Sequence, residues 1–597
     1  MAIMRGDVRI QVGETLHFQN EYGPELYPPF FGPQTASMVV EGTLSVTRFA
    51  AGGQGGSWLV GITTSNLHDP TIEIAATGVV RVINQLDFAT GLSSGSFGMH
   101  FVNRGLLEVG GRGQVHGVSS YDSYGVFENH GRIVVTSATG DGLGLRLNNF
   151  PTFTNTGTIE VFGGAGYPSY GVNFAGWARD FHNTGTIRAT DADPSVRSVG
   201  VSLWRGGNDG TWTNQGVIEG EIALQNPSHN LSQAGVGFRY ENSGRLLGDV
   251  LLDTGEDRFV NTGEIRGAVS LGANDDIYVG DLGQLFGSVS GGAGSDSISG
   301  GALGETLSGD AGADTLLGAA GDDVLAGGDD VDFLDGGLGF DTVSFAAAAA
   351  GVDAQFDLAR AGGDTLSSIE RALGSAFADT IAGALGAETL NGGAGADMMF
   401  GRGGADSLVG GSGGNFLRGD DGDDWIMGGA DTDDAHGNLG NDTVHGGAGD
   451  DWVVGGKDDD LLFGEDGGDV SLGNLGSDTI DGGSGEDVVR GGQGADIVRG
   501  GAGRDWVSGD RGDDQLFGGA GADTFHTFDG AGMDFVGDFN AAEGDRVFLL
   551  AGTRYNAYQS GADTLVDVVD AGGATTGRMV LVGVQMSGLP EGWIFGA

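Results

Sequence analysis

Aspartates recur every nine residues between residues 374 and 526, and each one follows a glycine-rich turn. The unit is G-G-x-G-x-D-x-U-x, where U is a large apolar residue, and Gly392 to Phe400 and Gly446 to Val454 are two copies of it. Side-chain carboxylates and turn carbonyls are the hard oxygen ligands that Ca²⁺ prefers, about six to eight at a time. The spacing therefore predicts calcium sites, with the aspartate at position six of each unit as a ligand.

Six units of the same kind precede this array, from Gly291 to Ser344. Together the two arrays give the predicted metal ligands, which are Asp296, Asp314, Asp323, Asp332, Asp341, Asp379, Asp397, Asp406, Asp424, Asp433, Asp442, Asp451, Asp460, Asp469, Asp478, Asp487, Asp496, Asp505, Asp514 and Asp523. Glu388 and Asn415 replace the aspartate in two units. Because Glu is longer and Asn lacks the charge, we expect weaker or empty sites there.

A single unit cannot close a calcium site or bury its apolar residue, so neighbouring units must stack into a solenoid. The glycines suit this, because they allow positive φ and a close approach of neighbouring backbones. The array resembles the nonapeptide repeats of the RTX family of secreted proteins. The resemblance implies a right-handed parallel β-roll with calcium held between successive turns. It also implies export by a type I secretion machinery that reads an uncleaved C-terminal signal.

A second and looser repeat, aromatic-x-Asn-x-Gly-x-aliphatic, occupies the N-terminal half of the chain. Its asparagines are Asn103, Asn129, Asn155, Asn183, Asn214, Asn242 and Asn261. The spacing between them suits one coil of a parallel β-helix, with insertions absorbed in loops. Aromatic and aliphatic residues alternate as core-facing strands require, and stacked Asn side chains can hydrogen-bond along the solenoid. This half resembles the right-handed β-helices of large secreted and surface-displayed bacterial proteins.

The junction between the two repeats predicts how the domains follow one another. Asp257, Asp276 and Asp296 recur at a spacing close to two nonapeptides, so we expect the β-helix to pass into the β-roll as one rod without a flexible linker. The expected all-β chain has an N-terminal cap or arm (1–35), a parallel β-helix (36–290), a first β-roll (291–344), an insert (345–373), a second β-roll (374–526) and a C-terminal cap with the secretion signal (527–597).

The composition excludes several classes of protein. The formal charge is −54, from 82 acidic and 28 basic residues, and such a chain repels nucleic acid and anionic lipid headgroups. About 20 bound Ca²⁺ would neutralise much of this charge. The absence of cysteine excludes disulfides, thiolate metal sites and a cysteine nucleophile. The N-terminus lacks the apolar core of a cleaved export signal, and no stretch approaches the roughly 20 apolar residues of a membrane helix.

An enzyme is the alternative interpretation, and it would need a site in the N-terminal half. No H-E-x-x-H zinc motif is present, and Gly91 to Gly95 fits G-x-S-x-G without the surrounding α/β pattern of lipases. Some polysaccharide epimerases and lyases combine a β-helix with a calcium roll. The candidate groups for that chemistry are His116, Tyr121, Asp122, Tyr124, His130, Arg179, Asp180 and His182. The Y-G-x-D-P-H-E signature of mannuronan epimerases is absent, so we assign no catalytic residue.

The sequence thus predicts a secreted, calcium-binding structural protein without enzymatic activity. Surface layer, biofilm matrix and adhesin are the expected roles, at the cell surface or outside the cell. The expected partners are calcium, the type I secretion machinery and either further copies of the chain or a cell-surface polysaccharide, without nucleic acid and without membrane insertion. External calcium at millimolar concentration would fold the array, because extracellular sites commonly bind at about 10⁻⁴ to 10⁻³ M.

Overall fold

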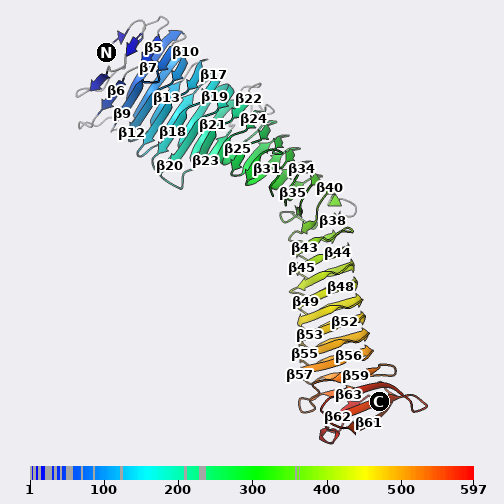
Figure 1. The fold of residues 1–597 in the computed structure, drawn as a ribbon. Coiled ribbons are helices and arrows are strands. Elements are labelled where there is room, and N and C mark those ends of the chain that lie inside the picture. Colours follow the sequence, from blue (N-terminus) through cyan, green and yellow to red (C-terminus); the bar gives the residue numbers. More distant parts are fainter. Residues whose placement is uncertain are drawn as a thin grey trace. The chain divides into compact units, whose positions relative to one another are not determined.

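The predicted all-β fold is confirmed by the computed structural model of the protein, drawn in Figure 1. It describes residues 71–596, except for 85–87, 121–124, 141, 149, 207–210, 227–236, 357–359 and 362, and before residue 71 it describes only the strands β1 to β7. The described part contains no α-helix. The expected cap at residues 1–35 lies mostly outside the described residues. The chain divides into two compact units, Met1–Gly339 and Phe340–Ala597.

The first unit begins as a β-helix with three strands in each coil. One coil consists of β11 (His100–Asn103), β12 (Leu106–Gly111) and β13 (Val115–Ser120). The next coil consists of β14 (Val126–Asn129), β15 (Arg132–Ser137) and β16 (Gly142–Leu147). Each strand pairs in parallel with its counterpart, so Phe101 lies opposite Phe127 and Leu107 lies opposite Ile133. The sequence period between successive asparagines is therefore one turn of the solenoid.

Aromatic rings stack through the core of this β-helix. The ring centroids of Phe101 and Phe127 lie 4.9 Å apart, those of Phe127 and Phe153 lie 5.3 Å apart, and those of Phe153 and Phe181 lie 5.0 Å apart. All four side chains are buried. Trp212 continues the column at 4.6 Å from Phe181. This offset stacking follows from the repeat, because the aromatic residue occupies the same strand position in every coil.

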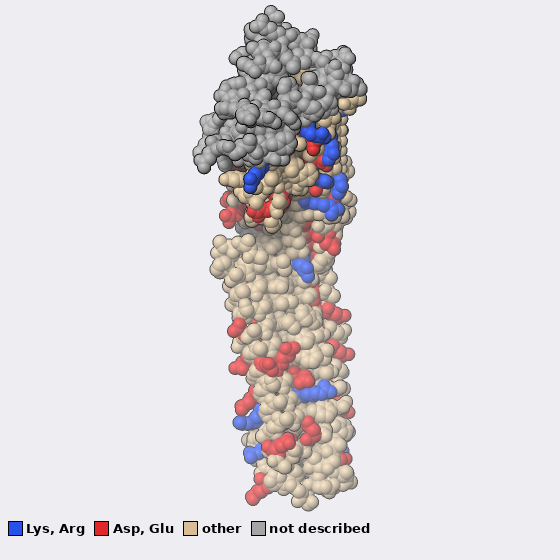
Figure 2. Space-filling view, turned by 90° about the vertical axis from the view of Figure 1, so that its left-hand side faces the viewer, with Lys and Arg blue, Asp and Glu red and all other residues tan. Residues whose placement is uncertain are grey.

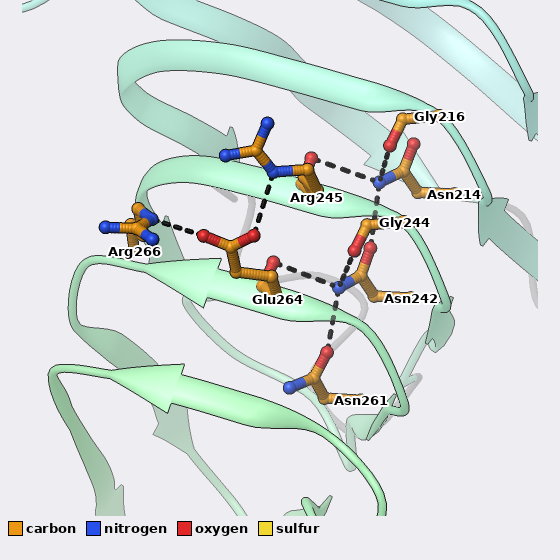
Figure 3. A network of polar contacts seen from close by, with 8 residues as sticks. All are labelled: Asn214, Gly216, Asn242, Gly244, Arg245, Asn261, Glu264 and Arg266. Atoms are coloured by element: carbon orange, nitrogen blue, oxygen red, sulfur yellow. Dashed lines mark hydrogen bonds and ion pairs between the residues drawn. The ribbon is translucent and has the colours of Figure 1, made fainter.

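A ladder of buried asparagines runs beside the aromatic column. The Nδ2 group of Asn103 donates to Oδ1 of Asn129 at 2.7 Å, and the same bond links every following pair up to Asn242 and Asn261, at 2.7 to 2.8 Å. Figure 3 shows the last three members of this asparagine ladder, where Nδ2 of Asn242 also approaches the carbonyl oxygens of Gly244 and Glu264. Each amide from Asn103 to Asn242 therefore donates and accepts within the protein, as a buried polar group requires, whereas Nδ2 of the last member, Asn261, has no hydrogen-bond partner.

The coils become shorter where the β-helix meets the first β-roll. The coil of β26 (Arg258–Asn261), β27 (Glu264–Arg266) and β28 (Val269–Ala273) precedes a coil in which Gly280 replaces the asparagine. β28 pairs in parallel with β31 (Ser288–Ala293), and β31 pairs with β33 (Thr306–Ala311) of the roll. Parallel pairing thus continues from one solenoid into the other within this unit.

The second unit contains the long β-roll, in which two nonapeptides form one coil. β43 (Thr389–Ala394) pairs with β45 (Ser407–Ser412), and β44 (Met398–Gly403) pairs with β46 (Phe416–Asp421). Alternate units therefore belong to two different sheets, and each residue lies opposite its equivalent two units later. The position-eight side chains of both sheets point inward and are fully buried, for example Leu390, Met399 and Leu408.

Antiparallel strands flank this roll at both ends. Before it, β39 (Arg360–Ala361) pairs with β38 (Asp353–Gln355) and β40 (Asp364–Ser367). After it, β61 (Arg554–Ser560), β62 (Asp563–Val569) and β63 (Thr575–Leu581) form an antiparallel sheet. β59 (Met533–Val536) pairs in parallel with both β57 (Gln515–Gly521) and β63, so it joins the roll to the C-terminal sheet.

Candidate calcium sites

The position-six aspartates lie in the turns between the strands of the roll. In the unit that contains Asp397, the strands β43 and β44 leave Gly395 and Ala396 in a tight turn before the aspartate, and Gly395 has a φ of +133°. Only glycine adopts this conformation without strain. All 20 predicted ligands are buried, with at most 3% of each residue exposed. The repeat therefore forces a carboxylate into the interior at every turn.

One oxygen of each carboxylate accepts a hydrogen bond from the backbone of the preceding coil. The N–H of Asp433 donates to Oδ1 of Asp451, and the N–H of Asp451 donates to Oδ1 of Asp469, both at 2.8 Å. The same bond links Asp442 to Asp460 at 2.9 Å in the alternate units. The aspartates thus form two ladders, one for each set of alternate nonapeptides. We call them the aspartate ladders.

The other oxygen, Oδ2, has no hydrogen-bond partner in most of these carboxylates. The aspartates in which Oδ2 is buried and unpartnered include Asp296, Asp314, Asp397, Asp406, Asp424, Asp433, Asp442, Asp451, Asp460, Asp469, Asp478, Asp487, Asp496, Asp505, Asp514 and Asp523. A buried acceptor without a partner costs about 1 to 3 kcal/mol, and more when it is charged. A regular column of such oxygens is stabilised either by protons or by bound cations.

A glycine leaves space beside each orphaned oxygen. A Cβ atom built on Gly464 would stand 2.4 Å from Oδ2 of Asp469 and 2.4 Å from the carbonyl oxygen of Gly482. A Cβ on Gly473 would stand 2.2 Å from Oδ2 of Asp478 and 2.4 Å from the next coil's Gly491 carbonyl. A carboxylate oxygen and a backbone carbonyl oxygen therefore converge at position one of these two units. This all-oxygen set fits Ca²⁺, which accepts both kinds of ligand.

Burial raises the pKa of these carboxyl groups. Removal from water, opposed in part by the backbone hydrogen bond and reinforced by neighbouring aspartates, raises the pKa of Asp442 to about 7 and that of Asp460 to about 8. The same causes raise the pKa of Asp469 and Asp505 to about 7. Without a cation these groups hold protons near neutral pH, because a buried negative charge is costly. A divalent ion supplies the compensating charge.

Three positions differ from this arrangement. Oδ2 of Asp379 accepts hydrogen bonds from the N–H of Ser375 at 2.7 Å and from its hydroxyl, so both oxygens of this predicted ligand are used. In Glu388, Oε2 accepts from the N–H of Ala384 at 3.2 Å. Oδ1 of Asn415 accepts the ladder bond from Asp397 at 3.0 Å, as an aspartate would. The Nδ2 group of Asn415 also donates to the carbonyl oxygen of Gly428 at 3.4 Å, so each of these three turns satisfies its own side chain to a greater degree than the other turns do.

Three aspartates outside the predicted set share the same arrangement. Asp257, Asp276 and Asp534 are each about 1% exposed and have an unpartnered Oδ2. The N–H of Asp257 donates to Oδ1 of Asp276 at 2.6 Å, so an aspartate ladder starts inside the last coils of the β-helix. In the units of Asp257 and Asp276, position one is leucine instead of glycine, so the space beside Oδ2 that glycine leaves in the roll is filled. A signal existed in the sequence, because each of the three aspartates follows a glycine or asparagine turn.

Within the described residues, no cluster of three or more His, Asp or Glu side chains could hold a metal ion. This agrees with the ladder geometry, in which each turn supplies one carboxylate and the remaining oxygen ligands come from the backbone. The described residues also include no helix that is long and apolar enough to cross a membrane.

The candidate catalytic residues that the structure describes in the β-helix do not form one group. His116 is buried on β13, where loss of solvation, together with the charge of Arg146, lowers its pKa to about 4. His182 lies on the outer side, 2.7 Å from the hydroxyl of Thr213. Arg179 and Asp180 form an ion pair at 4.0 Å. Tyr121, Asp122 and Tyr124 lie outside the described residues.

His130 has partners that the sequence analysis missed. Its Nδ1 atom lies 2.8 Å from the hydroxyl oxygen of Thr156, and its Nε2 atom lies 3.1 Å from a carboxylate oxygen of Glu128. Side-chain hydrogen bonds from His130 and His100 lower the pKa of Glu128. The three groups stand on the outer side of neighbouring coils, where the parallel register places them side by side.

Comparison with known proteins identifies the repeat. The profile of the RTX calcium-binding nonapeptide repeat matches residues 288–302 and 308–343, and it matches overlapping stretches that together cover 361–525. No curated protein sequence matches the chain.

Two solved structures are similar to parts of this chain. The extracellular lipase LipA from Serratia marcescens is 15% identical over 45% of this chain and 45% of its own length, with a TM-score of 0.13. The AlgE6R3 subunit of the Azotobacter vinelandii mannuronan C5-epimerase is 22% identical over 28% of this chain and 80% of its own, with a TM-score of 0.11. At these scores neither likeness bears on function. The repeat profile and the aspartate ladders together show that residues 288–343 and 361–525 of this chain consist largely of RTX calcium-binding nonapeptide repeats.

Proposed function

We propose that the protein is a secreted structural component of the cell surface or extracellular matrix, which calcium folds after export. The unpartnered Oδ2 atoms of the aspartate ladders carry this proposal. Without calcium the roll must bury a column of like charges or hold protons on it, which disfavours the folded state. The chain therefore stays unfolded where calcium is scarce, as passage through a type I secretion machinery requires. It folds where calcium is millimolar.

The β-helix contributes a stable surface. Its outward charges pair from coil to coil, with Arg81 and Glu108 at 2.5 Å, Arg132 and Glu160 at 2.6 Å, and Arg188 and Glu219 at 2.6 Å. Arg245 and Arg266 both approach Glu264, as Figure 3 shows. Such exposed ion pairs add about 0 to 1 kcal/mol each to the stability of the fold. Their main effect is therefore to give the outer surface of the β-helix an ordered pattern of charge. An ordered repetitive face suits contact with another repetitive polymer or with copies of itself.

Charge is divided unevenly along the chain. Residues 1–290 contain 28 acidic and 16 basic residues, whereas residues 291–597 contain 54 acidic and 12 basic residues. On the face drawn in Figure 2, Lys and Arg side chains gather next to the residues drawn in grey, and along the rest Asp and Glu side chains are interspersed with a few Lys and Arg side chains. The β-helix is thus the part that can approach an anionic polysaccharide or a second copy, because it repels negative charge least.

Electron microscopy of the full chain, with calcium and with chelator, tests the structural role. We expect sheets or filaments with millimolar calcium and none with chelator. Dispersed particles in both conditions would contradict self-assembly. A parallel pull-down with purified surface polysaccharide separates assembly from adhesion, because an adhesin would bind the polymer while remaining dispersed.

A polysaccharide-active enzyme is the second candidate, and the contacts of His130 with Thr156 and Glu128 favour it. An imidazole held by a carboxylate can act as a base toward a uronate ring. A cleft of about 410 Å³ lies elsewhere on the β-helix, lined by Glu108, Arg112 and Thr136 among others, and His130 does not line it. The described site therefore lacks an enclosure for substrate, and this favours the structural role.

Incubation of the calcium-loaded protein with alginate and pectin, followed by NMR, decides between the two candidates. We expect neither unsaturated products nor a change in epimer content. Turnover that His130→Ala abolishes would establish the enzyme. His182→Ala is the matched control, because His182 contacts only a threonine hydroxyl at the corresponding outer side.

A further inference from the structure

The strand β61 forms an edge of the C-terminal sheet, near the C-terminus in Figure 1. It pairs antiparallel with β62 over all seven of its residues, Arg554–Ser560, and within the described residues it pairs with no strand on its other side. Beyond the pairing with β62, no backbone group of this strand bonds to another described backbone group. In an antiparallel pair, alternate N–H and C=O groups point away from the partner strand, so those of β61 face outward unpaired.

Both faces of β61 are open as well as its edge. Six of its residues are exposed, and Ala557 is half-buried. The neighbouring strand β62 differs, because Val566 and Val568 are fully buried there. Tyr555 and Tyr558 of β61 remain 40% and 38% exposed. The core of the sheet therefore ends at β62, and β61 extends past it as an exposed strand.

The sequence of β61 lacks the features by which proteins usually prevent an edge strand from pairing. Such features are lysines, inward-pointing charges, proline, bulges and a very short strand. Arg554, at the first position, is the one charged residue of this seven-residue strand. The pairing with β62 runs without a shift in register, whereas a shift between β62 and β63 lies at Val568 and Val569. The outer edge of β61 is therefore open to a further strand.

The distribution of charge permits a second copy of the chain to meet this edge. Two copies repel each other overall, because each has a formal charge of −54. The strand β61 contains no acidic residue and carries the single positive charge of Arg554. On β62, the carboxylate of Asp567 accepts a hydrogen bond from Tyr558 and is paired with Arg578 at 2.6 Å. Two copies can therefore meet along β61 without placing acidic side chains of the strand opposite each other.

The strand is also complementary to itself when two copies run antiparallel. An overlap of all seven residues centres on Ala557, which then lies opposite the same alanine of the second copy. The same overlap pairs Arg554 with Ser560, Tyr555 with Gln559, and Asn556 with Tyr558. None of these pairs opposes two like charges, and favourable cross-strand pairs contribute about 0.2 to 1 kcal/mol each. The small central alanine leaves room for the longer side chains on both sides of it.

We propose that β61 pairs antiparallel with β61 of a second copy, so that two C-terminal sheets join into one continuous sheet around a two-fold axis. The proposal deepens the structural role proposed above and rests on it, because it names the chain itself as the partner. Both copies use the same strand, so the contact closes on itself, and sheets or filaments need a further contact. A contact of one strand is smaller than the roughly 1,200 Å² of a stable interface, so the dimer should be weak and reversible.

Sedimentation velocity of the full chain with millimolar calcium, over a series of protein concentrations, tests the pairing. We expect a reversible equilibrium between monomer and dimer. Ala557→Asp and Ala557→Lys each place two like charges opposite each other at the two-fold axis, so each variant alone should raise the dissociation constant at least tenfold. An equimolar mixture of the two variants should restore the dimer, because the opposed charges then attract.

The mixture also separates repulsion from misfolding, since only folded variants can recover the dimer together. A chain that stays monomeric at every concentration would overturn the proposal, and so would a mixture that does not recover. Ala495→Asp is the matched control, because Ala495 is exposed in a turn of the roll where Asp459 and Asp513 occupy the same repeat position. This control should leave the dissociation constant unchanged. Equal weakening by Ala495→Asp would attribute the effect to net charge and overturn the pairing.

Hydrogen exchange at low and high protein concentration locates the contact. Amides of residues 554–560 should exchange more slowly at the concentration that favours the dimer, while the middle of the roll, residues 434–475, should not change. A dimer without this protection would place the interface elsewhere and overturn the proposal. Sheets or filaments without pairing of β61 would overturn this contact alone and leave the structural role standing. A β61 dimer that forms no larger assembly would support the contact and count against assembly into sheets or filaments.

Discussion

The asparagine ladder of the β-helix and the aspartate ladders of the β-roll place side chains of nearly equal shape at the same kind of buried position. An asparagine donates through Nδ2 and accepts through Oδ1, so Asn155 and Asn183 complete one another at 2.7 Å. An aspartate only accepts, so Asp451 takes one backbone N–H at Oδ1 and leaves Oδ2 unpartnered. Replacement of the Nδ2 group by a second oxygen turns a column that bonds to itself into one whose carboxylates need protons or a cation.

This difference shows how one chain can combine a region that is stable without a ligand with a region whose folding depends on calcium. From Asn103 to Asn242 the asparagine ladder satisfies its own hydrogen bonds without a ligand, so its stability does not depend on a bound ion. The aspartate ladders tie folding to the calcium concentration, because ligand binding to the folded state alone stabilises it in proportion to the logarithm of the free concentration. Both kinds of ladder are present in the coils that contain Asn261 and Asp257, where the buried ladder residue changes from asparagine to aspartate along the chain.

Removal of calcium should have the largest effect and should separate the two regions. With chelator we expect amide protection to be lost throughout the second β-roll, residues 374–526, while the coils of residues 100–225 keep theirs. Hydrogen exchange with mass spectrometry measures both regions in one experiment. Magnesium in place of calcium is the control, and it should fail to restore the roll because Mg²⁺ demands a smaller octahedral site. A roll that stays protected in chelator would contradict the requirement for a cation.

Exchange of the ladder residue in the β-helix should have the next largest effect. Asn183→Asp removes the Nδ2 donor that bonds to Asn214 at 2.8 Å and places a charge in the core. We expect a loss of about 2 to 4 kcal/mol of local stability, because a buried acceptor faces another acceptor. Thermal unfolding followed by circular dichroism measures it. Calcium should not restore the stability of the variant. Full restoration by calcium would show that a buried aspartate binds calcium at this position even without a glycine turn.

The reverse exchange in the roll should weaken calcium binding without loss of the fold. Asp451→Asn keeps an Oδ1 acceptor for the N–H of Asp433 but loses charge, as Asn415 does naturally in the same ladder. We expect the calcium midpoint of folding to rise roughly tenfold, equivalent to about 1.4 kcal/mol. A calcium titration followed by circular dichroism measures the midpoint. Asn415→Asp is the complementary variant, and its midpoint should fall.

Calcium affinity should decrease with acidity in the roll alone. Burial raises the pKa of Asp442 and Asp469 to about 7, above the usual carboxyl range, so the calcium-free roll is favoured when these groups are protonated and loses that stability as pH rises through about 7. Calcium needs the ionised form and competes with these protons. The calcium concentration at the midpoint of folding should therefore be roughly several-fold higher at pH 6 than at pH 8. Identical midpoints at both values would contradict the raised pKa.

The smallest expected effect concerns the core of the roll. Ser471 stands at position eight, where the neighbouring coils have Val453 and Val489, and its buried hydroxyl has no partner. Ser471→Val should stabilise the calcium-loaded roll by about 1 kcal/mol, because an unsatisfied polar group is replaced by an apolar one. A higher thermal midpoint with calcium measures the gain. Ser508→Val is the control, since its hydroxyl bonds to Asp510 at 2.6 Å and the substitution should not stabilise.

Local repetition made much of the architecture predictable. The nine-residue period placed every predicted aspartate in a turn, and the structure buries all of them. The asparagine spacing predicted a stacked, hydrogen-bonded column, and the bonds from Asn103 to Asn261 confirm it. The residues within each short repeat determine where its turn and its strand lie. Similar coils then stack so that equivalent positions lie opposite one another. That these 20 aspartates ligate calcium stays a prediction.

Only the tertiary structure decided which oxygen atoms are left without a partner. The sequence shows one period of nine, whereas the pairing of every second unit separates the aspartates into two ladders with different ends. Asp379 looks like any other repeat aspartate, yet Ser375 satisfies it, and Asp534 stands out of register, yet it is buried and unpartnered. The physical reason is that hydrogen-bond satisfaction depends on which N–H group lies within reach. That distance is set by the stacking of coils far apart in sequence.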